Sequence, residues 1–264
     1  HPNFELTFIS ANTNAGELIT AVHPQLIGFE NQRFSSLDIT EINKCDLVFL
    51  ALPHGESGKI VKEIKPGIKI VDLGADFRLK SKAKWTQYYL GSHAGVWTYG
   101  MPELVDHKSI ASATKVANPG CYATSIALGA APAASIADLS DVVVVAASGT
   151  TGAGRSAKIN LIASEIAGSL TSYKFGGVHQ HTPEIEQALT KLSGTSAKIS
   201  FTPILAPMPR GILATITAKM MKKMSTEEVH ALYTKYFADS QFVTVLPVGS
   251  MPKTASLTGS NHVQ

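Results

Sequence analysis

Continuous apolar runs mark the first half of the chain. Residues 46–52 form one such run, which Pro53-His54-Gly55 closes, and residues 68–73 form a second one after a short helical stretch at 58–65. Strands that are apolar without alternation are buried on both faces, which is typical of parallel sheets. An earlier run at residues 4–10 predicts a further strand ending in a polar loop. The first half therefore predicts a doubly wound α/β domain.

The second half mixes helices with strands that alternate or are rich in β-branched residues. Small residues from Cys121 to about Ala134 predict a helix, and residues 142–147 form the clearest strand of the chain. Further strands are predicted at 198–202, 211–221 and 242–246, and further helices at 156–167 and 225–237. The last helix opens with Ser225 and has Glu228 three residues later, which is the spacing of a capping box.

Length and composition favour two domains and a small anionic substrate. At 264 residues the chain exceeds the usual domain size of about 100–150 residues. Hydrophobic residues make up 44% and charged residues 16%, which suits a packed core. The net charge of +3 is mild, and no basic cluster with interleaved aromatics indicates nucleic-acid binding.

Cysteine content and hydropathy bear on the compartment. The two cysteines, Cys45 and Cys121, have no Cys-x-x-Cys metal spacing and are too few for a disulfide framework, so we expect a reducing compartment, the cytoplasm. No stretch reaches the roughly 18 uncharged apolar residues of a membrane span, so we expect no membrane insertion. Because His1-Pro2-Asn3 leads directly into an apolar run, we expect the chain to start inside a domain.

Cys121 is the leading candidate nucleophile. It follows Asn118-Pro119-Gly120 at the start of a predicted helix, where the helix dipole and free backbone N–H groups favour a thiolate and can hold an oxyanion. Cysteine is also among the residues most often buried as a small hydrophobe. Position alone leaves the two interpretations about equal. Cys45 lies beside a predicted buried strand and is expected to be structural.

The segment His179-Gln180-His181-Thr182-Pro183-Glu184 is the second candidate. If it is extended, both imidazoles face one side about 7 Å apart along the chain, and Pro183 favours extended backbone at Thr182. Either histidine could then serve Cys121 in acid–base catalysis, with Glu184 orienting one ring. A metal site ranks well below this, because no third ligand is evident. A surface-loop histidine is about as probable on spacing alone.

Glycine-rich and arginine-bearing turns supply candidate anion sites. Residues 148–155 join a predicted strand to a helix, so their N–H groups could hold a phosphate, with Arg155 adding charge. A flexible turn is the ordinary alternative. Arg78 and Arg210 lie in turns bounded by glycine or proline, where a guanidinium can bind a carboxylate or phosphate. Ordinary surface ion pairs would explain either arginine equally well.

Taken together, these segments resemble the N-acetyl-gamma-glutamyl-phosphate reductase family. The shared strings, in the family's order, are Leu52-Pro53-His54-Gly55, Gly74-Ala75-Asp76-Phe77-Arg78, Pro119-Gly120-Cys121-Tyr122, residues 148–155, residues 179–184 and Pro209-Arg210-Gly211-Ile212. The resemblance covers nearly the whole chain. It departs from the family pattern in two places, because an N-terminal strand with its glycine-rich turn and a C-terminal strand and helix are expected but missing.

The resemblance implies an α/β protein of two domains, with NADP as cofactor. A Rossmann-like doubly wound cofactor domain would span residues 1–120, and an α+β substrate domain with a mixed sheet would span 121–264. Cys121 would be the nucleophile and His179 the acid–base residue. Residues implied near the substrate are Arg78, Asn118, His181, Glu184 and Arg210. Residues assigned to the cofactor are Ser10, Asn12, Thr13, Pro53, His54, Ser148, Gly149, Gly152 and Gly154.

The implied reaction is NADPH-dependent reduction of N-acetyl-gamma-glutamyl phosphate to N-acetylglutamate 5-semialdehyde through a Cys121 thioester, in arginine biosynthesis. The polar loop at residues 10–13 offers no acidic side chain for an adenosine ribose, which favours NADP over NAD. The alternatives are a sister semialdehyde dehydrogenase, a cysteine acyltransferase or hydrolase without nicotinamide, and an inactive regulatory module. We also expect a homo-oligomer, either a dimer or a tetramer.

Overall fold

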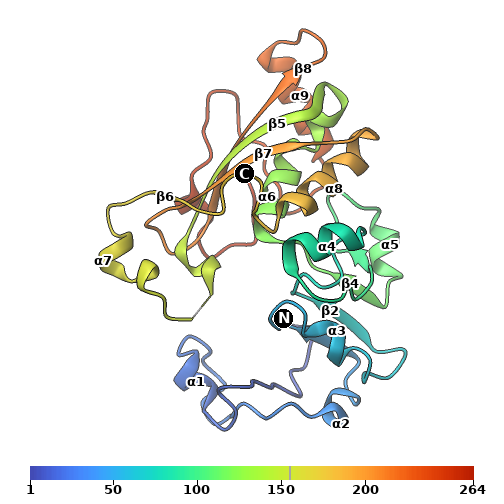
Figure 1. The fold of residues 1–264 in the computed structure, drawn as a ribbon, viewed down its shortest axis with the longest axis vertical. Helices are drawn as coiled ribbons and strands as arrows, with labels where there is room; N and C mark the ends of the chain where they lie inside the picture. Colours follow the sequence, from blue (N-terminus) through green and yellow to red (C-terminus); the bar gives the residue numbers. More distant parts are fainter. Residues whose placement is uncertain (155) are drawn as a thin grey trace.

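Two four-stranded sheets organise the chain in the computed structural model, which describes residues 1–154 and 156–264 (Figure 1). The first sheet has the order β1-β2-β4-β3, and all its neighbouring strands are parallel. Its strands are β1 (Leu47–Leu50), β2 (Lys69–Asp72), β3 (Thr98–Tyr99) and β4 (Lys115–Ala117). Val48, Leu50 and Ile70 lie in its core. The predicted α/β fold with a parallel sheet is confirmed.

Short helices precede and connect these strands. The helices α1 (Ile19–Val22) and α2 (Ile39–Ile42) come before β1, and α3 (Ser57–Ile60), α4 (Lys82–Tyr89) and α5 (His107–Ala111) lie between successive strands. The α3 helix is shorter than the predicted 58–65 stretch, because turns replace it after Ile60. The α4 helix begins where the Ser81 side chain accepts a hydrogen bond from the Lys84 N–H.

The strand predicted at residues 4–10 does not form. Residues 4–9 are irregular, and Ser10 makes an isolated parallel bridge to Ser35. The apolar pattern is present, but Phe4 and Leu6 are exposed. A strand needs a continuous ladder of backbone partners. Hydropathy predicted the strand, but this segment has no such ladder.

The second sheet is mixed, as predicted, with the order β6-β7-β5-β8. Its strands are β5 (Ala137–Ser148), β6 (Thr171–Ser172), β7 (Ile199–Leu205) and β8 (Ile212–Met220). β5 pairs in parallel with β7 and antiparallel with β8. Helices α6 (Cys121–Ala130) and α8 (Thr182–Ser193) contribute Ile126 and Ile185 to the core beneath one face. On the other face Val143, Val145 and Leu213 are exposed.

The helix predicted at 156–167 is wrong as a continuous element. Its described residues form a 3₁₀ turn at Ile159–Leu161 and the short helix α7 (Ala163–Ile166), separated by Ile162 in extended backbone. Ile159 and Ile162 are exposed, so no core contact stabilises a longer helix there. Figure 1 shows this segment projecting away from the mixed sheet.

The C-terminal region fits the sequence at one element and departs from it at another. Helix α9 (Thr226–Tyr236) begins with the predicted capping box between Ser225 and Glu228. The strand predicted at 242–246 is only a single bridge from Val243 to Val263. Further 3₁₀ turns lie at Pro132–Ser135, Thr150–Ala153 and Thr254–Leu257. Among the described residues, no helix is long and apolar enough to cross a membrane.

Candidate active site

Cys121 is the first residue of α6, and Gly120 is the N-cap in extended backbone. The loop before it is tied to the parallel sheet, because the Asn118 N–H donates to the Asp72 carbonyl at 2.8 Å. The Gly120 N–H donates to Glu184 Oε1 at 2.9 Å. The Cys121 thiol is free and exposed, and it lines a large cavity. This is the placement that the sequence predicted for a nucleophile.

Two effects act on the Cys121 thiol in opposite directions. The surrounding walls remove water and raise the pKa of Cys121, whereas the N–H groups of Tyr122 and Cys121 favour the thiolate and lower it. The net direction is upward. The helix terminus therefore does not produce a resting thiolate by itself, and the site needs a neighbouring base to remove the thiol proton.

The two histidines lie in a tight turn that leads into α8. The predicted extended form is wrong, because the Thr182 N–H donates to the His179 carbonyl and the helix starts at Thr182. Pro183 fits the first helical turn, where its missing N–H has no helical partner, so it does not force extended backbone. The imidazole centroids are 4.9 Å apart. Both rings still belong to one site.

The two imidazoles have different surroundings. His181 lies against the loop that ends at Cys121, because a Cβ built on Gly120 would be 2.5 Å from His181 Nε2. His179 is buried among the rings of Tyr122, Tyr173 and Phe201, and its Nδ1 accepts from the His181 N–H at 3.0 Å. Burial lowers the pKa of each histidine to about 3, so both rings are neutral near pH 7, and the same burial weakens them as bases.

Arg78 and Glu184 meet in the interior rather than in the cavity. Arg78 donates to the Asn118 and Leu73 carbonyls at 2.7 and 2.9 Å, and its Nη1 lies 3.4 Å from Glu184 Oε2. The Tyr99 hydroxyl donates to Glu184 Oε1 at 2.8 Å. The two charged side chains are 5% and 0% exposed, which leaves no open surface for a substrate. This network fixes the loop that ends at Cys121.

The cavity gathers most of the predicted site residues. It has a volume of about 1980 Å³, above the roughly 300–1,000 Å³ of a single small-molecule site, so it has room for a substrate and part of a cofactor. Predicted residues that line it are Cys121, His179, His181, Asn118, His54, Ser148, Gly149, Gly152 and Arg210. Predicted residues outside its lining are Arg78, Glu184, Ser10, Asn12, Thr13, Pro53 and Gly154.

The glycine-rich turn after β5 packs against the Arg210 segment. A Cβ on Gly149 would be 2.7 Å from the Arg210 backbone nitrogen, and Thr151 Oγ1 donates to the Pro209 carbonyl. Only glycine permits this approach. Arg155, for which we predicted a phosphate contact, lies outside the described residues.

The cofactor residues predicted outside the glycine-rich turn occupy two separate places. His54 lies in the turn after β1, where both carboxylate oxygens of Asp76 accept backbone bonds, from the Gly55 N–H at 2.7 Å and the Gly58 N–H at 2.9 Å. This turn lies at the carboxyl end of a parallel strand, the usual edge for dinucleotides. The loop at residues 10–13 is exposed, and Thr13 lines a second, shallow pocket.

Models of two semialdehyde dehydrogenase domains match the chain. The NAD binding domain matches residues 1–113 and the dimerisation domain matches residues 121–264. N-acetyl-gamma-glutamyl-phosphate reductases from Acidothermus cellulolyticus and Salinispora tropica are each 50% identical, and each match covers the whole chain and 78% of the relative. The chain belongs to the N-acetyl-gamma-glutamyl-phosphate reductase family. It is an oxidoreductase with the family's NAD binding domain.

Solved structures support the fold of this reductase family member. The chain is similar to aspartate semialdehyde dehydrogenase II from Vibrio cholerae, with a TM-score of 0.67 at 13% identity over 98% of this chain and 78% of the other. The enzyme from Candida albicans, solved with NADP, gives a TM-score of 0.64 at 13% identity over 97% and 79%. At these identities the likeness concerns the fold alone.

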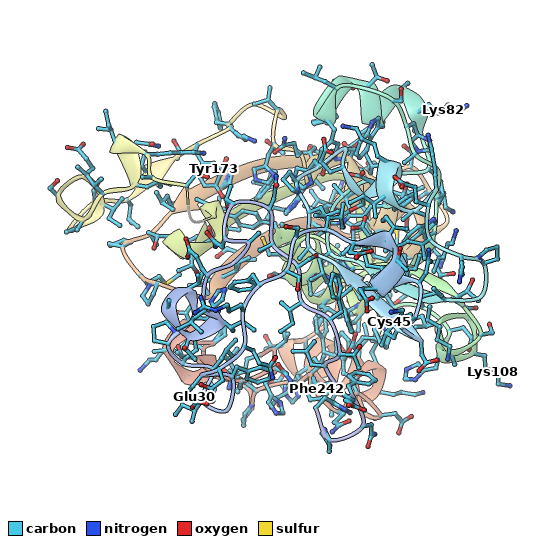
Figure 2. All side chains as sticks on the ribbon, turned by 90° about the horizontal axis from the view of Figure 1, so that it is seen from below. Glu30, Cys45, Lys82, Lys108, Tyr173 and Phe242 are labelled. Atoms are coloured by element: carbon cyan, nitrogen blue, oxygen red, sulfur yellow. The ribbon has the colours of Figure 1, made fainter. Side chains whose placement is uncertain are left out.

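Several residues of the site escaped the sequence analysis. The hydroxyl of Tyr88 donates to the Gly177 carbonyl at 2.8 Å, and that of Tyr89 donates to the Gln180 carbonyl at 3.3 Å, so α4 holds the histidine turn. Tyr173 donates to the Tyr122 hydroxyl at 2.9 Å. Figure 2 shows Tyr173 well separated from Cys45. No spacing rule links these tyrosines to the histidines, because the contacts depend on tertiary structure.

Proposed function

We propose that this chain reduces N-acetyl-gamma-glutamyl phosphate to N-acetylglutamate 5-semialdehyde through a thioester on Cys121, with NADPH as reductant. The observation that carries the proposal is a free thiol at a helix start beside neutral imidazoles in one large cavity. The identity of 50% over the whole chain to reductases of that name supports the substrate. We place the domain boundary between residues 120 and 121.

The first step is formation of the thioester. The neutral imidazole of His181 takes the thiol proton as sulfur attacks the acyl carbon. The raised pKa of Cys121 and the lowered pKa of His181 both oppose a free thiolate, so the proton moves together with formation of the carbon–sulfur bond. The bond from that carbon to the phosphate oxygen breaks, and phosphate leaves with the electron pair. The Cys121 N–H stabilises negative charge on the carbonyl oxygen. We assign the acid–base role to His181 rather than His179, because His181 contacts Gly120.

The second step reduces the thioester. NADPH, when bound, supplies the hydride. The turn bearing His54 and the loop at residues 148–152 would hold the nicotinamide end, and hydroxyl and amide groups at residues 10–13 would face the adenosine end. As the tetrahedral adduct collapses, the carbon–sulfur bond breaks, and protonated His181 returns its proton to the sulfur. We place Arg210 at the substrate carboxylate.

The exposed face of the mixed sheet bears on assembly, and the free thiol bears on the compartment. We propose that copies associate as a dimer or tetramer through the open face of the mixed sheet, where Val143, Val145 and Leu213 are exposed. The dimerisation domain model covers this region. A reducing compartment keeps a free thiol reduced, so we place the enzyme in the cytoplasm.

The test is NADPH oxidation with N-acetyl-gamma-glutamyl phosphate, aspartyl phosphate and no acyl phosphate. We expect oxidation with the first compound, much less with the second, and slower turnover with NADH. Equal or faster rates with aspartyl phosphate would identify a sister enzyme. Release of N-acetylglutamate without NADPH consumption would identify a cysteine hydrolase.

A further inference from the structure

Cationic side chains line the cavity. Lys158, Lys174 and Arg210 all line it. In the part of the chain that the structure describes, none of the three takes part in an ion pair. Glu165 also lines the cavity, but no ion pair among the described residues joins it to either lysine. Unpaired cations in a concave site favour an anionic ligand.

Lys174 is held beside the histidines. Its Nζ donates a hydrogen bond to Gln180 Oε1 at 2.5 Å, and Gln180 lies between His179 and His181 in the chain. The Lys174 charge also contributes to the lowered pKa of both histidines and of His54, so it acts on the reacting end of the cavity. The lysine therefore lies beside the histidines, in the same cavity as Cys121.

Lys174 is repelled by a neighbouring positive charge, and its backbone is strained. Desolvation and the charge of Lys158 lower the pKa of Lys174, so the two ammonium groups repel each other. The Lys174 backbone has φ of 44°, a left-handed conformation that is uncommon outside glycine. An anion between the lysines would relieve the repulsion.

We propose that Lys174, assisted by Lys158, binds the phosphoryl group of the acyl phosphate and the phosphate that leaves it. The proposal rests on the proposed function. A substrate of this kind has two anionic groups, and only the phosphoryl group is bonded to the carbon that Cys121 attacks. The α-carboxylate lies several bonds away. Lys174, fixed to the histidine turn, is therefore assigned to the phosphoryl group.

The reverse reaction separates the two anions. In that direction N-acetylglutamate 5-semialdehyde forms a thiohemiacetal with Cys121, NADP accepts hydride to leave the thioester, and a phosphate oxygen attacks the thioester carbon. The carbon–sulfur bond then breaks, and the thiolate leaves. Phosphate and semialdehyde are separate reactants here, and the carboxylate belongs to the semialdehyde, so each has its own Michaelis constant.

The experiment compares Lys174→Gln, Lys174→Arg and Lys158→Gln with the wild type, and Lys191→Gln serves as a control on an exposed lysine of α8. We expect Lys174→Gln to raise the KM for phosphate about tenfold or more, with the KM for semialdehyde changed less than about twofold. Lys158→Gln should give a smaller rise. Lys174→Arg should keep most phosphate affinity, and Lys191→Gln should match the wild type.

A second readout does not need turnover. Inorganic phosphate should slow alkylation of Cys121 in the wild type and in Lys191→Gln, and it should protect much less in Lys174→Gln. An unchanged KM for phosphate with unchanged protection would overturn the inference, as would a rise confined to the semialdehyde KM. A wild type that oxidises no NADPH but shows Lys174-dependent protection would refute the proposed function and leave the phosphate site standing.

Discussion

The ring of His181 lies directly against Gly120, so that a Cβ added to Gly120 would meet the ring nitrogen Nε2 at 2.5 Å. The contact places this imidazole against Gly120, the residue that precedes the nucleophile Cys121. Gly120 has φ of −71° and ψ of 152°, which any residue can adopt, so the glycine is needed for space rather than for backbone freedom. The closeness of the two elements is what makes the thiol and the base one site.

Gly120→Ala should displace His181 without unfolding the protein. Because a misplacement of about 1 Å can cost a hundredfold in rate, we expect kcat to fall about tenfold to a hundredfold. The measurement is steady-state kinetics with thermal melting alongside. In a His181→Asn background the same change should cost little more activity, because the two substitutions share one contact. Additive losses would show that the contact is not used in catalysis.

The two histidines should separate kinetically. His181→Asn should depress kcat strongly, because it removes the base beside Gly120. His179→Asn should mainly loosen the turn, because it removes the ring nitrogen Nδ1 that accepts a hydrogen bond from the His181 N–H. Single-turnover rates measure the chemical step directly. If His179→Asn abolishes that step and His181→Asn changes only the Michaelis constant, the roles are reversed.

Glu184→Gln should loosen the loop that ends at Cys121 and lower the stability of the protein. The amide keeps an acceptor for the Gly120 N–H but leaves Arg78 without a countercharge, so we expect unfolding to be easier by about 3 kcal/mol. The kcat should fall more than KM rises. Glu186→Gln is the matched control, because among the described residues Glu186 pairs only with the more exposed Lys84 and Lys198, and it should cost below about 1 kcal/mol. Denaturant titration measures the free energy of unfolding of both variants. Equal losses of stability would contradict a stabilising role for the buried Arg78–Glu184 network.

Acid should destabilise the protein through the histidines. Both have pKa values lowered to about 3, so between pH 6.5 and about 3 the unfolded chain takes up protons that the folded chain does not. Stability should therefore fall as pH drops through this window. Urea unfolding at several pH values should show a shallower fall for His181→Asn. The exposed His107→Asn should follow the wild type, and a wild-type slope of zero would refute the burial argument.

Sequence patterns predicted the elements whose signals are local. Strand β5 and the capping box before α9 were predicted, because apolar continuity and the Ser225 to Glu228 spacing are each sufficient. Cys121 was placed at a helix start for the same reason. The strands expected at 4–10 and 242–246 failed, because their pairing depends on partners that hydropathy does not reveal.

The functional roles of charged residues could not be predicted in the same way. Arg78 was expected at the substrate from its turn and Glu184 from the family resemblance, yet each is the other's buried partner although they lie 106 residues apart. Lys174 drew no attention, because its contact with Gln180 depends on the turn that the histidines form. Residue type predicts chemistry, and only the fold decides whether the charge faces the substrate or the interior.

Trapping the acyl-enzyme tests the central claim most directly. The protein is mixed with N-acetyl-gamma-glutamyl phosphate without NADPH, and intact-mass and peptide mass spectrometry locate any adduct. We predict one N-acetylglutamyl group on Cys121, lost in Cys121→Ser, kept in Cys45→Ser, and discharged when NADPH is added. An adduct on another residue, or full NADPH oxidation by folded Cys121→Ser, would contradict the thioester mechanism.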